Sequence, residues 1–222
     1  MTEQYKNEIT LKTDNYKNNI ESNMVWLELY YNHKFLLYCQ QKILIDEILD
    51  CLLVGLNQAS IFATNHLLER MLKVALITNE KQGVYIGDID YTSKYNEAKA
   101  KYDSQTLSNN IKYAFEQGII NEEEKNELFS LKDNFRNPYS HATMGIILKN
   151  FPQSISGFMG ANISDGINAL QEGKQIPLSE KNDIPTDIMG QYIQKDIAKD
   201  IAFEYFKRIF NIMCKIDDRL KI

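Results

Sequence analysis

The chain of 222 residues is 44% hydrophobic and 25% charged, with four prolines and ten glycines, which is the composition of a folded globular protein rather than a disordered or fibrous one. Its three cysteines are widely spaced, which favours buried free thiols over a disulfide framework or a zinc site, and no stretch of about 20 residues is apolar enough to span a membrane. A net charge of −5 excludes broad attraction to a polyphosphate, so any nucleic-acid contact must be focused on a local cationic pocket.

Residues 1–22 carry few large apolar side chains at regular spacing, which predicts a flexible N-terminal arm in front of a helical domain over 23–222. This opening is polar and lacks the pattern of a signal peptide, so we expect a cytoplasmic protein. From Met24 to Tyr38 the aromatic and aliphatic residues indicate a core helix.

The next segments alternate between amphipathic helices and short connections. Apolar residues recur at helical spacing over 45–56 and again over 67–76, with charged residues on the opposite faces. Two glycines lie within 83–90, which we interpret as a loop. Ser104 is placed to cap a further helix that Gly118 closes.

Asn121 and the three glutamates that follow it are typical of a helix start, because acidic residues in the first turn complement the helix dipole. This helix should run through Phe135. The pair Asn137-Pro138 predicts its end, because the residue before a proline is pushed out of the helical region.

Residues 151–185 are rich in Gly, Ser, Asn and Pro, which predicts an insertion of loops and short helices over about 150–187. From Tyr192 to Ile216 the apolar spacing predicts a long final helix. The fold class is therefore all-α: a helical bundle of about six helices, with a long loop-rich insertion before the final helix.

The best candidate for chemistry is the segment from Arg136 to His141. RNA cleavage without a metal needs groups that accept and donate protons, and a cation for the crowded phosphorane. Arginine offers a planar charged fork, histidine titrates near neutrality, and Asn137 can orient either the phosphate or the imidazole. In an unbroken helix, positions five apart point about 140° apart. Either the break re-aims Arg136 toward His141, or two chains pair to complete the site.

Arg136-Asn137, three residues and then His141 resembles the Arg-Asn-x-x-x-His signature of HEPN-domain proteins, and the resemblance in layout covers about 24–143. Members of this superfamily are commonly metal-independent endoribonucleases of toxin–antitoxin and phage-defence systems, and they usually act as dimers with the motifs facing each other. The resemblance implies a HEPN-like domain that needs no metal or cofactor and cuts RNA to 2′,3′-cyclic phosphate and 5′-hydroxyl ends. It also implies a homodimer with an antitoxin or defence-system partner.

Carried onto this chain, the resemblance assigns phosphate contacts to Arg136, polar support to Asn137 and proton transfer to His141. Several members have an acidic residue on an earlier helix near the site, and the candidate here is Glu69, with Lys73 four residues later. Some HEPN toxins carry a tyrosine that a partner enzyme modifies two residues after the histidine. Thr143 stands there in this chain, which puts that route of control in doubt.

Plainer interpretations stay open. In one, Arg136 binds the last carbonyls of a helix that ends at Asn137-Pro138, and in the other, Glu69 and Lys73 form an ordinary surface pair at i and i+4. The alternative function is a catalytically inactive HEPN-like module that binds RNA, nucleotide or a protein partner. The acidic net charge favours that alternative.

Overall fold

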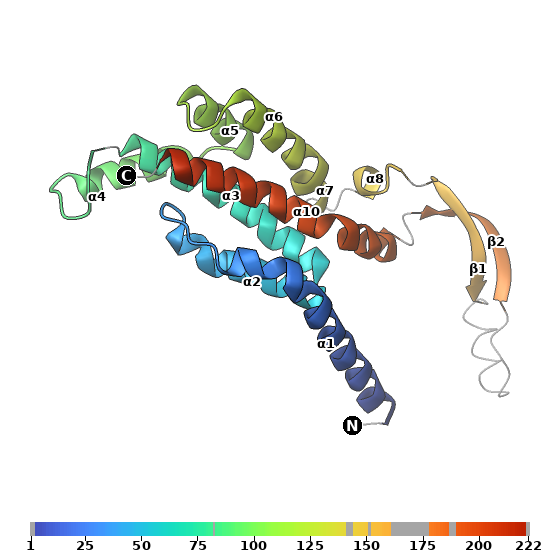
Figure 1. The fold of residues 1–222 in the computed structure, drawn as a ribbon. Coiled ribbons are helices and arrows are strands. Elements are labelled where there is room, and N and C mark those ends of the chain that lie inside the picture. The colour runs from blue at the N-terminus through green and yellow to red at the C-terminus, as the bar shows by residue number, and fades with distance from the viewer. Residues whose placement is uncertain are drawn as a thin grey trace. The chain divides into compact units, whose positions relative to one another are not determined.

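A computed structural model describes residues 3–81, 83–140, 144–150, 152–160, 178–186 and 190–220. Its helical content confirms the predicted all-α class (Figure 1). The chain forms two units, one of Met1–His141 with Ile197–Ile222 and one of Ala142–Asp196. The second unit begins before the insertion predicted over about 150–187 and ends after it.

The elements of the first unit are helical. They are α1 (Glu3–Tyr31), the short 3-10 helix η1 (Cys39–Gln41), α2 (Lys42–Val54), α3 (Asn57–Glu80), α4 (Tyr91–Asp103), α5 (Leu107–Glu116), α6 (Glu122–Leu131), the π-helical turn η2 (Lys132–Arg136), α7 (Asn137–Ser140) and most of α10 (Gly190–Arg219). Helix α3 is central, because it contacts α2, α4, α5, η2 and α7 (Figure 1). This central position brings one face of α3 beside the segment that carries the candidate motif.

The core lies between the amphipathic helices, as their apolar spacing predicts. Leu68 and Leu72 of α3 and Phe206 and Ile209 of α10 have no exposed surface. Tyr205 is equally buried, and its ring stacks on Phe135 with centroids 5.0 Å apart. Burying each such side chain stabilises the fold by about 1.5–3 kcal/mol, so these two helices anchor the first unit.

The N-terminal segment is helical from Glu3, a structure that the flexible arm predicted over 1–22 does not specify. Helix α1 contains no Gly or Pro, and two of its asparagines bind the end of α2. Asn19 donates to the Val54 carbonyl at 2.9 Å, and Asn23 donates to the Leu52 carbonyl at 3.0 Å. The Val54 carbonyl belongs to the last turn, which has no intrahelical donors, whereas the Leu52 carbonyl also accepts from the Gly55 N–H. A search for apolar spacing does not detect bonds of this kind.

One of the predicted helix caps is a different residue. Asn121 caps α6 with a full capping box, and Gly118 follows α5 with φ of 71°, both as predicted. Ser104, however, ends α4, and Thr106 is the residue that caps α5. Thr106 has the extended backbone that an N-cap requires, and its hydroxyl accepts from the Asn109 N–H at 3.2 Å.

The second unit contains strands that the sequence analysis did not predict. Besides α8 (Met144–Ile147), it has β1 (Ser154–Gly160) paired antiparallel with β2 (Leu178–Pro185), with an irregularity between Ile155 and Gly157. The second strand, with the sequence LSEKNDIP, lacks the alternation of apolar residues that identifies a half-buried strand. Backbone pairing therefore forms this hairpin without a matching side-chain pattern.

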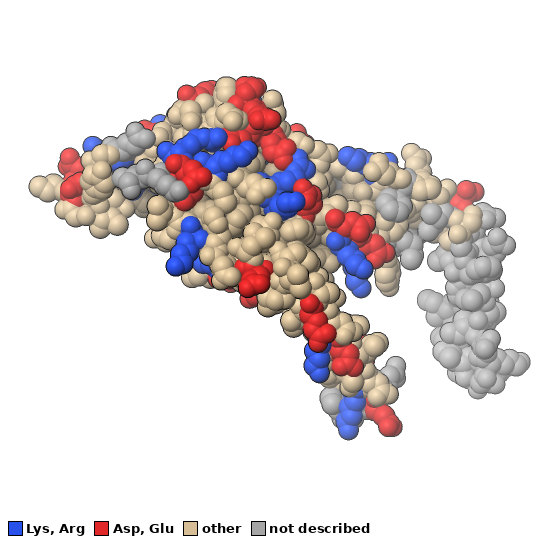
Figure 2. Space-filling model, viewed as in Figure 1, with Lys and Arg blue, Asp and Glu red and all other residues tan. Residues whose placement is uncertain are grey.

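The charged surface is mixed. On the coloured part of the face in Figure 2, Lys and Arg side chains stand among Asp and Glu side chains, without a broad basic area. No helix in the described part of the chain has the length and apolar character to cross a bilayer. The three cysteines are free, and Cys39 is exposed rather than buried as predicted.

Candidate functional site

The helix does not end at Asn137-Pro138, which corrects the sequence prediction. Helix α6 passes through the π-helical turn η2 and continues as α7. The Asn137 N–H donates to the Lys132 carbonyl, five residues back. Proline has no N–H, and its ring collides with the carbonyl four residues earlier in a regular helix, which is that of Asn134. We attribute the wider turn to this collision, because it lets the chain continue in helical form past Pro138.

The turn faces a cleft of about 300 Å³. Three elements supply its walls: α3, the start of α5, and the segment from η2 to α7. The lining residues are Glu69, Gln105, Thr106, Leu107, Ser108, Lys132, Arg136 and Asn137. Three of the residues selected from the sequence, Glu69, Arg136 and Asn137, therefore share one concave site.

Within the described residues, the side chains of Glu69 and Asn137 hold Arg136. Its Nε and Nη2 atoms donate to Glu69 Oε1 at 3.0 and 2.6 Å, and its Nη1 donates to Asn137 Oδ1 at 3.1 Å. The side chains of Arg136 and Glu69 are 24% and 34% exposed, so the ion pair is neither fully buried nor fully solvated. The plain interpretation of Arg136 as the cap of a helix end is wrong, because the helix continues and the guanidinium bonds to α3.

Lys73 lies outside this cleft. Its Nζ pairs with Asp103 at 3.3 Å, at the end of α4. Glu69 and Lys73 thus bond to different partners, each on another segment, rather than to each other. Lys73 has no place in the site that Glu69 helps to form.

His141 lies outside the described residues. Ser140, the residue before it and the last of α7, is exposed but bonds to a buried pair of side chains. Asn65 on α3 donates to the Ser140 hydroxyl at 3.1 Å, and the Tyr205 hydroxyl donates to the Asn65 carbonyl oxygen at 2.7 Å. Burial is the main cause that raises the pKa of Tyr205 far above its ordinary value, with a smaller contribution from Glu69, so this hydroxyl remains a donor. The chain is therefore anchored to α3 and α10 up to Ser140.

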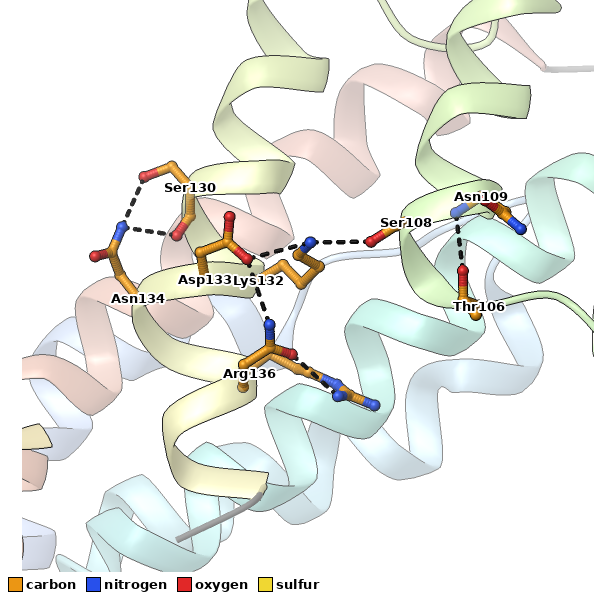
Figure 3. Close-up of polar contacts among 9 residues, drawn as sticks. Thr106, Ser108, Asn109, Ser130, Lys132, Asp133, Asn134 and Arg136 are labelled. Atoms are coloured by element: carbon orange, nitrogen blue, oxygen red, sulfur yellow. Dashed lines mark hydrogen bonds and ion pairs between the residues drawn. The ribbon is translucent and has the colours of Figure 1, made fainter. Parts of the chain in front are cut away.

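Three residues that sequence reasoning missed, Lys132, Ser108 and Asp133, extend the polar site. The Lys132 Nζ donates to the Ser108 hydroxyl at 2.9 Å and lies 3.1 Å from Asp133 Oδ1. The same Asp133 oxygen accepts from Asn137 Nδ2 at 3.3 Å. Figure 3 shows the resulting chain of contacts from Ser108 on α5 through the π turn to Arg136. The available sequence signal was the spacing of four residues between Lys132 and Arg136, and again between Asp133 and Asn137.

The cleft has a locally positive lining in an acidic chain. Lys132 and Arg136 contribute two positive charges to the wall and Glu69 one negative charge. Asp133 is not part of the wall and is 60% exposed, but its Oδ1 lies 3.1 Å from the Lys132 Nζ and offsets part of that charge. The N-terminus of α5, which begins in the wall at Leu107, adds a partial positive charge of roughly half a unit. This arrangement suits an anionic ligand.

A second pair of reactive residues has a structural explanation. Cys214 Sγ lies 3.6 Å from His33 Nε2. Burial, followed by the nearby Asp217 and Asp218, raises the pKa of Cys214 to about 11, so the thiol stays protonated near neutral pH. The His33 ring packs edge-on against Phe35. This pair lacks the thiolate that a cysteine nucleophile requires.

Comparison with known proteins identifies no relative. No family model, no curated protein and no solved structure matches the chain. Within the described residues, no group of three or more His, Cys, Asp or Glu side chains is arranged to hold a metal ion. Any functional assignment therefore depends on the cleft and on the motif beside it.

Proposed function

We propose that this chain is a metal-independent endoribonuclease whose active site is the cleft at the π turn. The observation that carries the proposal is the position of Arg136, oriented by Glu69 and Asn137 in a wall that also contains Lys132. Such orientation before the substrate arrives is what makes a charged group effective in stabilising a transition state. An arginine fork also matches the paired oxygens of a phosphate.

The proposed reaction is an internal transfer on RNA. The 2′-hydroxyl oxygen bonds to the adjacent phosphorus, and the bond from phosphorus to the 5′-oxygen breaks. The products are a 2′,3′-cyclic phosphate and a 5′-hydroxyl. Arg136 neutralises the phosphorane, and His141 transfers a proton to or from one of the two oxygens.

The reaction needs one proton acceptor and one proton donor, and each chain offers one histidine in the motif. We therefore include a homodimer in the proposal, in which the second His141 supplies the complementary role. By the same resemblance we propose an RNA substrate in the cytoplasm and control by an antitoxin or another defence protein. Size-exclusion chromatography with light scattering measures directly whether the chain forms the homodimer.

The test is cleavage of RNA by the purified chain in EDTA, with the product ends analysed. Arg136→Ala and His141→Ala should each lower the rate at least about a hundredfold. The matched control is Arg208→Ala, because Arg208 is 29% exposed and pairs with Glu127 much as Arg136 pairs with Glu69. The control should keep its activity. Equal rates for Arg136→Ala and the unmodified chain would exclude the assignment.

A second candidate function is binding of RNA or a nucleotide without cleavage. It is favoured by the carboxylate of Glu69, which already occupies part of the Arg136 fork, and by the net charge of −5. In that case RNA remains intact over long incubation, while Arg136→Ala still weakens its binding. A gel-shift assay beside the cleavage assay separates the two functions.

A further inference from the structure

Lys132 is the more deeply placed of the two cations in the cleft. Its side chain is 16% exposed, against 24% for Arg136. Ordering and partly burying a long lysine side chain costs free energy. The contacts of Lys132 should therefore show which interactions offset this cost. They do not join distant parts of the fold by charge, because its carboxylate partner is the next residue, Asp133.

A true structural ion pair in this protein has a different form. Arg219 on α10 binds the buried Glu124 on α6 through two nitrogens, both at 2.7 Å. That pair connects two helices far apart in the sequence. Lys132 instead reaches across to a neutral hydroxyl, Ser108, at the start of α5. Its positive charge is shared between the exposed Asp133 and the cleft that it lines.

Counting donors gives the same result. A lysine ammonium has three N–H donors. Among the described residues, Ser108 accepts from one of them, Asp133 forms an ion pair with the ammonium at 3.1 Å, and the Phe129 ring centroid lies 5.1 Å from the nitrogen. One donor therefore has no oxygen acceptor within the described part of the protein, although the ammonium belongs to a residue that lines the cleft.

The volume of the cleft indicates the size of ligand that it can hold. Its volume of about 300 Å³ is at the lower end for pockets that hold small molecules, about 300–1,000 Å³. A single phosphate group does not fill such a space. One nucleotide unit does, and a nucleotide within an RNA chain carries a phosphate on each side.

We propose that Lys132, together with the hydroxyl of Ser108, forms a second phosphate-binding subsite that holds the RNA phosphate next to the one bound by Arg136. This inference rests on the proposed function, because it names a further contact of the same substrate. A compact ammonium suits a phosphate that is held without reacting, whereas the arginine fork suits the one that changes charge. Lys132 is thus a substrate-positioning residue.

The two cations should differ in their kinetic effects. The charge on the neighbouring phosphate is the same in the ground state and in the transition state. Lys132→Gln should therefore raise KM more than it lowers kcat, since it removes binding that both states share. Arg136→Ala should act mainly on kcat.

The decisive experiment measures binding of a fluorescent 2′-deoxy oligonucleotide, which lacks the attacking hydroxyl and so remains uncut. Its dissociation constant is followed by anisotropy over a range of salt concentrations. Each phosphate contact on a single strand contributes about 0.7 to the slope of log affinity against log salt. Lys132→Gln should lower the slope by about that amount and weaken binding several-fold, and Lys132→Arg should restore the slope.

Lys125→Gln is the matched control. Lys125 lies on α6, the helix that leads into the π turn. It is 22% exposed and pairs with the nearby Glu122, but it does not line the cleft. The subsite is refuted if Lys132→Gln leaves slope and affinity unchanged, or if Lys125→Gln lowers them equally. Circular dichroism of each variant excludes unfolding as the cause.

This assay separates the subsite from the nuclease. RNA that is cut, combined with an unchanged slope in Lys132→Gln, removes the subsite and keeps the nuclease. A changed slope with RNA that is never cut keeps the subsite and removes the nuclease. Absence of any binding to the oligonucleotide removes the subsite, and RNA cleavage in EDTA then decides the nuclease alone.

Discussion

Glu124 offers the sharpest test of how the helices are held together. Its side chain is only 3% exposed, and it accepts two bonds from Arg219, both at 2.7 Å. It also closes the capping box of α6, because its Oε2 accepts from the Asn121 N–H at 3.0 Å. One carboxylate therefore joins the start of α6 to the end of α10.

The cost of Glu124→Gln follows from these contacts. The substitution keeps the shape but removes the charge, and it places an amide donor against the guanidinium. A hydrogen bond to a charged group contributes about 1.5–3 kcal/mol, and a helix cap about 1 kcal/mol. Arg219 is 35% exposed and regains water, which offsets part of the loss. We expect the free energy of unfolding to fall by about 2–3 kcal/mol.

The loss should depend on pH with a definite sign. Burial raises the pKa of Glu124, but the bonds from Arg219 and from the Asn121 backbone together lower it by a larger amount. The pKa therefore lies below its ordinary value. A group with a lowered pKa stabilises the fold above its unfolded pKa, and this stability is lost as the pH falls through the folded value. The difference between Glu124→Gln and the unmodified chain should therefore be complete at neutral pH and shrink below about pH 4.

Urea unfolding followed by tryptophan fluorescence measures this effect. Trp26 is the single tryptophan of the chain, and its ring lies 4.1 Å from that of Phe203 in the same unit as Glu124. Glu122→Gln is the control, because Glu122 is in the same first turn but is 61% exposed. It should cost less than about 1 kcal/mol. Equal costs for the two substitutions would refute the argument from burial.

Three further outcomes follow from the described contacts. Arg136→Lys should cut RNA at least about a hundredfold more slowly, because lysine cannot reproduce the fork, and an unchanged rate would contradict this. Tyr205→Phe leaves the buried Asn65 oxygen without its donor at 2.7 Å and should lower the free energy of unfolding by about 1–2 kcal/mol, measured by its urea midpoint. At neutral pH iodoacetamide should label the exposed Cys39 first and Cys214 only after unfolding, because burial raises the pKa of Cys214 to about 11. Mass spectrometry measures the two labelling rates, and equal rates would disprove this.

The parts of the fold that sequence predicts are those that bury a continuous apolar stripe. Helices α3 and α10 do so along most of their length, and their spacing identifies them. Helix α1 does not, because residues 3 and 5–18 are exposed and its later bonds to α2 come from Asn19 and Asn23. The strands β1 and β2 were missed for a related reason, since backbone pairing rather than a buried face defines them.

The site was predictable only in its local part. Arg136 and Asn137 are adjacent and form a recognisable pattern, and the resemblance points to Glu69, which bonds to Arg136 in the structure. Lys132 could not be selected in this way, because its meaning depends on Ser108, which lies 24 residues earlier on α5. Tertiary packing brings these two together, and no short motif contains both.

Pro138 belongs to the site even though it does not line the cleft. In a regular helix, neighbouring side chains point about 100° apart and do not face each other. Here the Arg136 Nη1 and the Asn137 Oδ1 are 3.1 Å apart, at the junction of the π turn with α7. The proline excludes the regular turn at this point, so a residue that sequence analysis treats as a helix terminator instead shapes the helix that presents the arginine. The segment Arg136-Asn137-Pro138 is therefore a single physical unit, in which the third residue sets the geometry of the first two.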